Sequence, residues 1–326
     1  MIKGYDIFSS VTSVETLLHA YYRASKGRKQ KSSTLLFRIN EQANILQLQS
    51  ELQSGIYHPG TYRSFHIHEP KERVITAAQF RDRVVHHAII LASESYFERF
   101  QIYHSYACRK QKGSHKAILY ALHNCRKYQY YLKMDIRKFF DSVDHTLLKD
   151  LLRRLFADRK LLQLFDRIID SYEKGPNSGI PIGNLTSQYF ANFYLGFMDH
   201  FIKEVLQVKP YVRYMDDFLL FSNNLSELNN WKRAIEDYVD KTLTLRCKEP
   251  IMNSTTNGIS FLGFLIKPKG VFLLSKKKKI IKEKYMDLKG NFVMGKLGEP
   301  SYVQKVTTLF SYIEFARSRD FRRKLV

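Results

Sequence analysis

The most informative segment of this 326-residue chain is Tyr211-Val212-Arg213-Tyr214-Met215-Asp216-Asp217-Phe218-Leu219-Leu220-Phe221. Its aromatic and branched apolar flanks predict a β-hairpin with Asp216 and Asp217 at the turn. Two adjacent like charges repel, and their desolvation is costly unless a cation lies between them. Mg²⁺ binds such carboxylates and leaves its other positions to water and substrate phosphates. The segment therefore predicts a two-metal phosphoryl-transfer site, with an acidic, solvated turn as the alternative.

A two-metal site needs a third carboxylate, and Asp135 is the leading candidate. It ends the run Tyr130-Tyr131-Leu132-Lys133-Met134-Asp135, which predicts a strand that could lie next to the hairpin. The competing carboxylates are Asp141, Asp144 and Asp199. Asp144 is better explained as the N-cap of the following helix, and Asp199 as an exposed helix residue.

The composition points to a polyanionic partner. Lys and Arg number 53 against 31 Asp and Glu, a formal net charge of +22, which favours nucleic acid. The 23 Phe and 21 Tyr fit base stacking beside cations, although most such rings belong to cores. Three cysteines without a CxxC spacing indicate a reducing compartment. The region after Met1 has no long apolar run, so we expect neither a signal peptide nor a membrane span, and a soluble, intracellular protein.

Hydrophobic periodicity predicts a mixed α+β fold. Gly175 to Gly179 form a clear loop. Helices are expected near 14–22, 33–54, 79–97, 145–155, 160–172 and 225–241, and again from 275 onward; strands are expected within 62–76, 130–135, 211–221 and 259–264. The histidines His66, His68, His86 and His87 have no Cys or carboxylate at ligand spacing, so we expect solvated or packed side chains there.

With these segments in this order, the chain resembles the reverse transcriptases from about Tyr62 to Phe264. The motifs that carry the resemblance are Tyr214-Met215-Asp216-Asp217, Met134-Asp135-Ile136-Arg137-Lys138-Phe139-Phe140 and Phe261-Leu262-Gly263-Phe264, the last of which is similar to the primer grip. The resemblance implies a right-hand polymerase fold with fingers, a ferredoxin-like palm sheet and a short helical thumb. The expected divisions are a helical extension (1–60), fingers (61–134), palm (135–266, with a helical insertion near 145–178) and thumb (267–326).

The resemblance also implies roles for individual residues. Asp135 and Asp216 would hold two Mg²⁺ ions (with Mn²⁺ as a substitute) together with the backbone carbonyl of Ile136. Asp217 completes the catalytic and metal-binding set, to which it mainly contributes charge. The other implied residues bind the incoming dNTP: Lys71 and Arg73 at the triphosphate, Phe140 as the steric gate against a ribose 2′-hydroxyl, and Ile182, Gly183 and Gln188 in the template-and-nucleotide loop. Lys248 is a candidate proton donor to pyrophosphate.

A narrower resemblance rests on Ile182-Gly183-Asn184-Leu185-Thr186-Ser187-Gln188, which is similar to the Ile-Gly-x-x-x-Ser-Gln pattern of diversity-generating retroelement reverse transcriptases. Many group II intron relatives have Pro-Gln-Gly at this place. The family implies a bacterial or phage-encoded, cytoplasmic enzyme. It copies a template-repeat RNA into cDNA with errors at adenines, alongside a small basic accessory protein oligomer. An apolar Ile182 in place of a polar Gln removes one hydrogen-bonding group near the nascent base pair, which suggests low fidelity.

Two other functions remain open from the sequence. One is a bacterial defence or retron-type reverse transcriptase that makes a fixed DNA product. The other is a non-catalytic RNA-binding scaffold on a polymerase fold, which the retention of Asp135, Asp216 and Asp217 disfavours.

Overall fold

The computed structural model describes residues 4–28, 30–67 and 73–325. The chain forms two compact units, each assembled from three separate stretches. The first unit contains Met1–Tyr103, Ile136–Val205 and Ile235–Cys247; the second contains His104–Asp135, Leu206–Ala234 and Lys248–Val326. The expected boundary between residues 134 and 135 falls inside a strand of the second unit.

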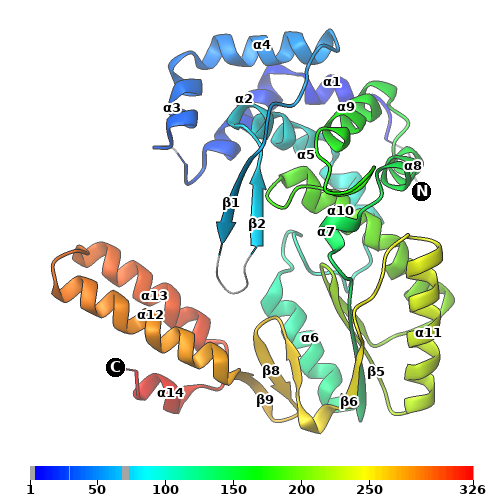
Figure 1. Cartoon of the computed structure of the whole chain (residues 1–326), viewed down its shortest axis with the longest axis vertical. Coiled ribbons are helices and arrows are strands. Elements are labelled where there is room, and N and C mark those ends of the chain that lie inside the picture. Colours follow the sequence, from blue (N-terminus) through cyan, green and yellow to red (C-terminus); the bar gives the residue numbers. More distant parts are fainter. Residues whose placement is uncertain (1–3, 29, 68–72, 326) are drawn as a thin grey trace. The chain divides into compact units, whose positions relative to one another are not determined.

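The first unit is mainly helical (Figure 1). Its helices are α1 (Ile7–Val11), α2 (Val14–Ser25), α3 (Ser32–Ile39), α4 (Glu41–Gln53), α5 (Phe80–Phe100), α7 (Phe139–Ser142), α8 (His145–Leu155), α9 (Arg159–Asp170) and α10 (Leu185–His200), which continues into a π-helical turn, η1 (Phe201–Val205). Strands β1 (Arg63–Ile67) and β2 (Arg73–Ala77) form an antiparallel hairpin. Asp144 accepts a hydrogen bond from the Leu147 amide at 2.7 Å, which confirms it as the N-cap of α8.

Two local predictions for this unit are wrong. The helix expected over 33–54 is interrupted at Asn40, a residue type that favours helix ends over helix interiors. Asp199 is fully buried, not exposed, because α10 is covered around most of its circumference. The buried residues of α10 include Phe190, Phe193 and Met198, and this all-round burial conceals the polar side that an exposed helix would show.

The second unit contains a four-stranded antiparallel sheet in the order β4-β5-β3-β6. Its strands are β3 (Tyr130–Asp135), β4 (Tyr211–Tyr214), β5 (Asp217–Ser222) and β6 (Ile251–Ser254). Helices follow β3 in the chain, and α11 (Leu225–Lys241), which continues into the first unit, separates β5 from β6. This order of helices and strands is the split β-α-β arrangement of ferredoxin-like folds, so the predicted palm sheet is confirmed.

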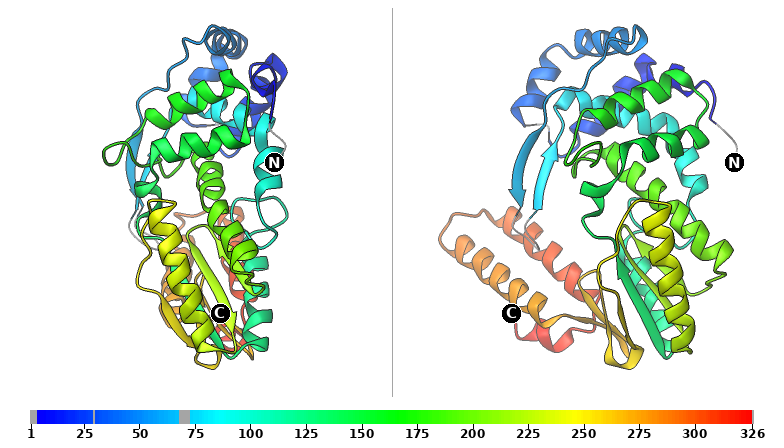
Figure 2. Two further views of the ribbon diagram at one scale, coloured as in Figure 1. Left: turned by 90° about the vertical axis from the view of Figure 1, so that its right-hand side faces the viewer. Right: turned by 45° about the vertical axis from the view of Figure 1, so that its right-hand side comes forward.

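The rest of the second unit packs around one apolar core. Helix α6 (Ser114–Lys127) and a three-stranded sheet of β7 (Ile259–Phe261), β8 (Phe264–Lys267) and β9 (Gly270–Leu273) contribute to it. A short turn, η2 (Thr255–Asn257), precedes β7. The helices α12 (Ser275–Val293) and α13 (Glu299–Glu314) lie side by side, and α14 (Arg319–Arg323) follows them (Figures 1 and 2). None of the helices in the described ranges is long and apolar enough to cross a membrane.

His86 lies in the core of the first unit and should make the fold sensitive to acid. Its side chain is 1% exposed, and neither ring nitrogen has a hydrogen-bond partner among the described residues. Burial, followed by the charges of His87 and Arg83, lowers the pKa of His86 from 6.5 to about 3. The unfolded chain therefore binds more protons than the folded chain between pH 6.5 and 3, and stability falls as the pH falls through this window.

We expect His86→Leu to stabilise the protein more at pH 5 than at pH 8. The difference should be about 2 kcal/mol, because 1.5 pKa units separate pH 5 from the unfolded value at 1.36 kcal/mol per unit. Urea unfolding at the two pH values measures it. An equal gain at both would mean that His86 is not the titrating group.

Candidate active site

Asp135 and Asp217 face each other across the central strands of the palm sheet. They are direct register partners in the antiparallel pair β3 and β5, so their side chains lie on the same face of the sheet. Asp217 also pairs with Tyr214 across the β4–β5 hairpin, whose turn contains Met215 and Asp216. The side chains of Asp135 and Asp217 are 29% and 20% exposed. Three carboxylates are thus concentrated at one end of this sheet.

Arg213 braces the hairpin from within the second unit. Its side chain is fully buried; Nη1 donates to the Met215 carbonyl at 3.1 Å and Nη2 to the Ser105 hydroxyl at 3.1 Å. Met215 has a positive φ of 55°, a conformation that costs energy in a residue with a side chain. Arg213 therefore holds a strained turn in the form that carries Asp216. Sequence reasoning missed this residue, although an Arg within an apolar strand is a signal for it.

Two lysines form ion pairs with two of these carboxylates. The Lys133 ammonium lies 3.3 Å from Asp217 Oδ2 and donates to the Ser260 carbonyl of β7 at 2.7 Å. The Lys248 ammonium lies 2.7 Å from Asp135 Oδ1, and its backbone amide donates to the Asp135 carbonyl at 2.8 Å. Lys133 was also missed from the sequence. Its position two residues before Asp135 on a strand puts it on the same face of the sheet.

The environment of Asp217 disfavours its negative charge. Burial raises the pKa of Asp217 from 3.8 to about 6; the Lys133 ammonium opposes this shift, and the charges of Asp135 and Asp216 add to it. The folded state therefore holds a proton on Asp217 that the unfolded state has released between pH 3.8 and 6. Stability consequently falls as the pH rises through this range.

Asp217→Asn should stabilise the metal-free protein at pH 8 more than at pH 4. The expected difference is about 3 kcal/mol, from a shift of roughly two units at 1.36 kcal/mol per unit. Unfolding in urea with a chelator, at both pH values, is the measurement. If wild type and variant lose stability equally between pH 4 and pH 8, another group causes the pH dependence.

The oxygen atoms at this site fit a divalent cation that brings further ligands with it. Oδ1 of Asp135 and Oδ1 of Asp217 are buried and accept no hydrogen bond from the described residues, although the former pairs with Lys248. In the described ranges no group of three or more His, Cys, Asp or Glu side chains is placed so that it could hold a metal ion by itself. Mg²⁺ commonly binds through one or two carboxylates and completes its shell with water and substrate phosphates.

The residues expected at the nucleotide belong to the first unit. The Ile180 amide donates to the Phe140 carbonyl at 2.8 Å, and the Thr76 amide of β2 donates to the Ile182 carbonyl at 2.9 Å. These bonds join the loop before α10 to α7 and to the β1–β2 hairpin. Gln188 lies on α10 and is half-buried. Ile136 is buried, and its backbone forms an isolated antiparallel β-bridge with Cys247.

Gly183 is required where this loop meets β2. Its φ is +134°, and an added Cβ would lie 2.9 Å from the Thr76 carbonyl oxygen, so any side chain would push the loop from the strand.

Of the two residues expected at the triphosphate, Arg73 begins β2 opposite Ile67, and Lys71 lies outside the described residues.

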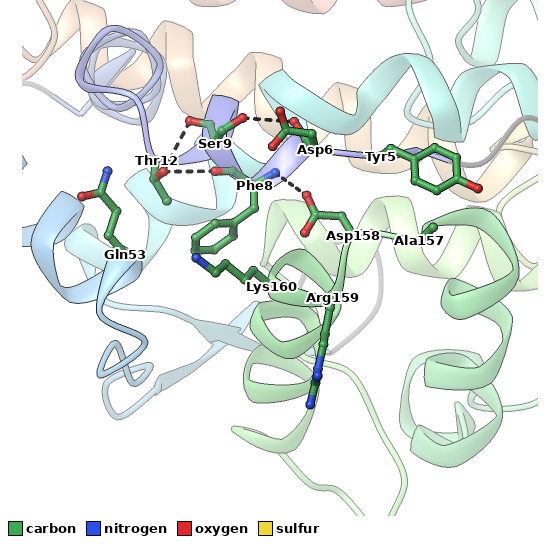
Figure 3. Close-up of a pocket in the computed structure, with 10 residues that line it drawn as sticks. All are labelled: Tyr5, Asp6, Phe8, Ser9, Thr12, Gln53, Ala157, Asp158, Arg159 and Lys160. Atoms are coloured by element: carbon green, nitrogen blue, oxygen red, sulfur yellow. Dashed lines mark hydrogen bonds between the residues drawn. The ribbon is translucent and has the colours of Figure 1, made fainter.

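A cavity of about 640 Å³ in the first unit contains none of the predicted site residues (Figure 3). Phe8, Thr12, Gln53, Asp158 and Lys160 contribute to its lining. The Asp158 carboxylate accepts hydrogen bonds from the Phe8 amide at 2.7 Å and the Leu161 amide at 3.1 Å. Asp158 thus joins α1 to the start of α9, which is a structural role.

Comparison with known proteins identifies the family. Residues 67–266 match the family model described as reverse transcriptase (RNA-dependent DNA polymerase). This match covers more than half of the chain, which therefore belongs to the reverse transcriptase family. The predicted right-hand fold is also confirmed by telomerase from Candida albicans, solved with a TWJ fragment of telomeric RNA. That structure has a TM-score of 0.52 at 13% identity and covers 89% of this chain and 59% of its own.

Two curated relatives are similar over parts of the sequence. The group II intron-encoded protein LtrA of Lactococcus lactis subsp. cremoris is 28% identical over 175 residues, 51% of this chain and 28% of LtrA. Protein YkfC of Escherichia coli (strain K12) is 28% identical over 266 residues, 66% of this chain and 69% of YkfC. The chain therefore spans little more than a quarter of the length of LtrA.

Proposed function

We propose that this protein is an RNA-directed DNA polymerase that copies a template RNA into cDNA. The observation that carries the proposal is the cross-strand pair of Asp135 and Asp217 beside the hairpin of Asp216, in a chain of the reverse transcriptase family. The net charge of +22 suits a template RNA and a primer or cDNA strand as partners.

The proposed reaction is attack of a primer 3′-hydroxyl on the α-phosphate of a dNTP. A new P–O bond forms, the bond to pyrophosphate breaks, and the hydroxyl loses its proton. Asp135, Asp216 and the Ile136 carbonyl are the proposed ligands of two Mg²⁺ ions. When bound, such ions lower the pKa of the attacking hydroxyl and offset the charge on the leaving group.

The other residues bind and orient the substrates. Lys71 and Arg73 neutralise the β- and γ-phosphates, and Phe140 excludes the ribose 2′-hydroxyl. Lys133 keeps Asp217 oriented through its contacts with the carboxylate and with Ser260. Lys248 is the proposed proton donor to pyrophosphate, a role in which it must leave the Asp135 carboxylate.

Primer extension on a defined RNA template with dNTPs and Mg²⁺ tests the polymerase proposal. DNA that depends on template, dNTPs and metal is the expected product. If none forms, the assay is repeated with the cognate RNA and partner protein. Absence of DNA there, with retained RNA binding, would favour the non-catalytic scaffold.

We further propose that the enzyme belongs to a diversity-generating retroelement. The pattern from Ile182 to Gln188 supports this, and such an enzyme would work with a template-repeat RNA and a small basic accessory protein oligomer. Sequencing the cDNA separates the candidates. Errors concentrated opposite template adenines support the retroelement, whereas accurate copying favours a defence or retron-type enzyme.

Ile182→Gln should reduce misincorporation by about tenfold. A restored polar group near the nascent pair adds discrimination of roughly 1–3 kcal/mol, and 1.4 kcal/mol corresponds to a factor of ten. Error rates from cDNA sequencing measure the effect, with Ile182→Leu as a matched apolar control. Equal error rates in the two variants would exclude Ile182 as a determinant of fidelity.

A further inference from the structure

Helix α6 carries a surface stripe composed of the exposed residues Lys116, His123 and Lys127 and the half-buried Tyr120 (the α6 stripe). Residues three and four apart on a helix share one face, and the stripe extends about 16 Å at 1.5 Å per residue. The opposite face of α6 is buried in the core of the second unit through Ala117, Ile118, Ala121 and Cys125. Lys116, His123 and Lys127 therefore point away from that core, whereas Tyr120 lies at its edge and packs partly against it.

The segment around the α6 stripe is basic without interruption. No Asp or Glu occurs from residue 102 to residue 134, a span that contains seven Lys and Arg. The Lys116 ammonium donates to the Gln111 carbonyl at 2.5 Å, and the Lys127 ammonium lies 5.7 Å from the centre of the Tyr128 ring. Within the described ranges neither lysine has a carboxylate partner, so both charges remain available to an anion.

Aromatic rings fill the interval between the two lysines. The rings of His104 and Tyr120 are stacked at 4.0 Å with an angle of 20°, and the His123 ring is near-parallel to Tyr120 at 6.5 Å and 21°. His123 is exposed, so it presents a ring face or edge to solvent beside a preformed aromatic stack. A second ring system can extend such a stack.

We propose that the α6 stripe binds single-stranded nucleic acid. Cations that contact the backbone and rings that stack on bases are the two components of such sites. A duplex would not use the rings, because its bases are already stacked on one another, and an acidic peptide would need only the lysines. This proposal does not depend on polymerase activity, because it concerns the opposite side of α6 from the sheet-facing core.

The test uses fluorescence anisotropy to measure binding to the full chain. The labelled probes are an unstructured 12-nucleotide RNA, a single-stranded DNA of the same sequence, and a duplex. Lys116→Gln with Lys127→Gln should weaken RNA binding about tenfold. It should also reduce the slope of log Kd against log salt by about 1.4, or 0.7 for each lost phosphate contact. His123→Ala should weaken binding about fivefold and leave the salt slope unchanged, as expected for a lost stacking contact.

Lys232→Gln with Arg233→Gln on α11 is the matched control, because it removes the same charge from another helix of the second unit. Equal losses in the two double variants would overturn the proposal, since net charge alone would explain them. Equal sensitivity of duplex and single strand to His123→Ala would also overturn it. The RNA and DNA arms identify which strand is bound, and unchanged melting temperatures show that the variants fold.

Discussion

Replacing both Asp216 and Asp217 by Asn should abolish DNA synthesis, with kcat reduced by at least about 10³-fold. The amides keep the shape of the side chains but remove two negative charges from the end of the palm sheet, where Asp217 faces Asp135. A loss of 10³ corresponds to about 4 kcal/mol of transition-state stabilisation, and charge stabilisation by bound metal ions is of this size. Primer extension under single-turnover conditions measures the effect.

The matched control is Asp237→Asn with Asp240→Asn on α11, which removes two acidic charges from an exposed helix surface. Asp237 forms a surface ion pair with Lys241, and an exposed pair of this kind contributes little stability. The control should synthesise DNA at the wild-type rate, and both double variants should bind RNA normally. An Asp216 and Asp217 double variant that retained a tenth of the activity would show that the chemistry occurs elsewhere.

Arg213→Met should lower both stability and catalysis, although Arg213 is not expected to contact substrate. The fully buried guanidinium donates to the Met215 carbonyl and the Ser105 hydroxyl. Removing it leaves both acceptors without these donors, and hydrogen bonds from a charged group contribute roughly 1.5–3 kcal/mol each. We expect a loss of about 3 kcal/mol in the free energy of unfolding. Among molecules that remain folded, kcat should fall about 10²-fold, because the turn that carries Asp216 is no longer braced.

Two comparisons distinguish bracing from general destabilisation. Arg213→Lys keeps one donor and should recover part of the lost kcat, while Arg233→Met, at an exposed position on α11, should change neither quantity. Urea unfolding and kcat are measured well below the melting temperature. If kcat of folded Arg213→Met equals that of wild type, Arg213 stabilises the fold without positioning the site.

Local sequence signals predicted much of the fold. The strand Tyr130–Asp135 and the helix Leu225–Lys241 agree with the structure at both ends. The strand is a short, mainly apolar run that ends at a carboxylate, and the helix repeats its apolar residues at helical spacing. The cap at Asp144 was equally local. Asp135 was selected from the expectation that its strand would lie beside the hairpin, and the register places it opposite Asp217.

The unpredicted features depend on distant parts of the chain. Lys133 is held by a carbonyl 127 residues away in β7, and Arg213 by a hydroxyl 108 residues away. Nothing in the neighbouring sequence specifies such partners, so a lysine in a strand resembles any half-exposed residue. The burial of Asp199 is similarly a property of what packs around α10, which periodicity within one helix cannot reveal.

The interleaving of the two units has a consequence for folding during synthesis. The first unit is complete only when residues 235–247 have been synthesised. The second unit contains strands that precede that segment in the sequence and strands that follow it. An early N-terminal fragment therefore contains neither unit in full. Many contacts within each unit can form only after residues far along the sequence have been synthesised. Such high sequence separation slows folding and exposes unpaired strands for longer. A single proteolytic cut likewise cannot release either unit as a separate domain.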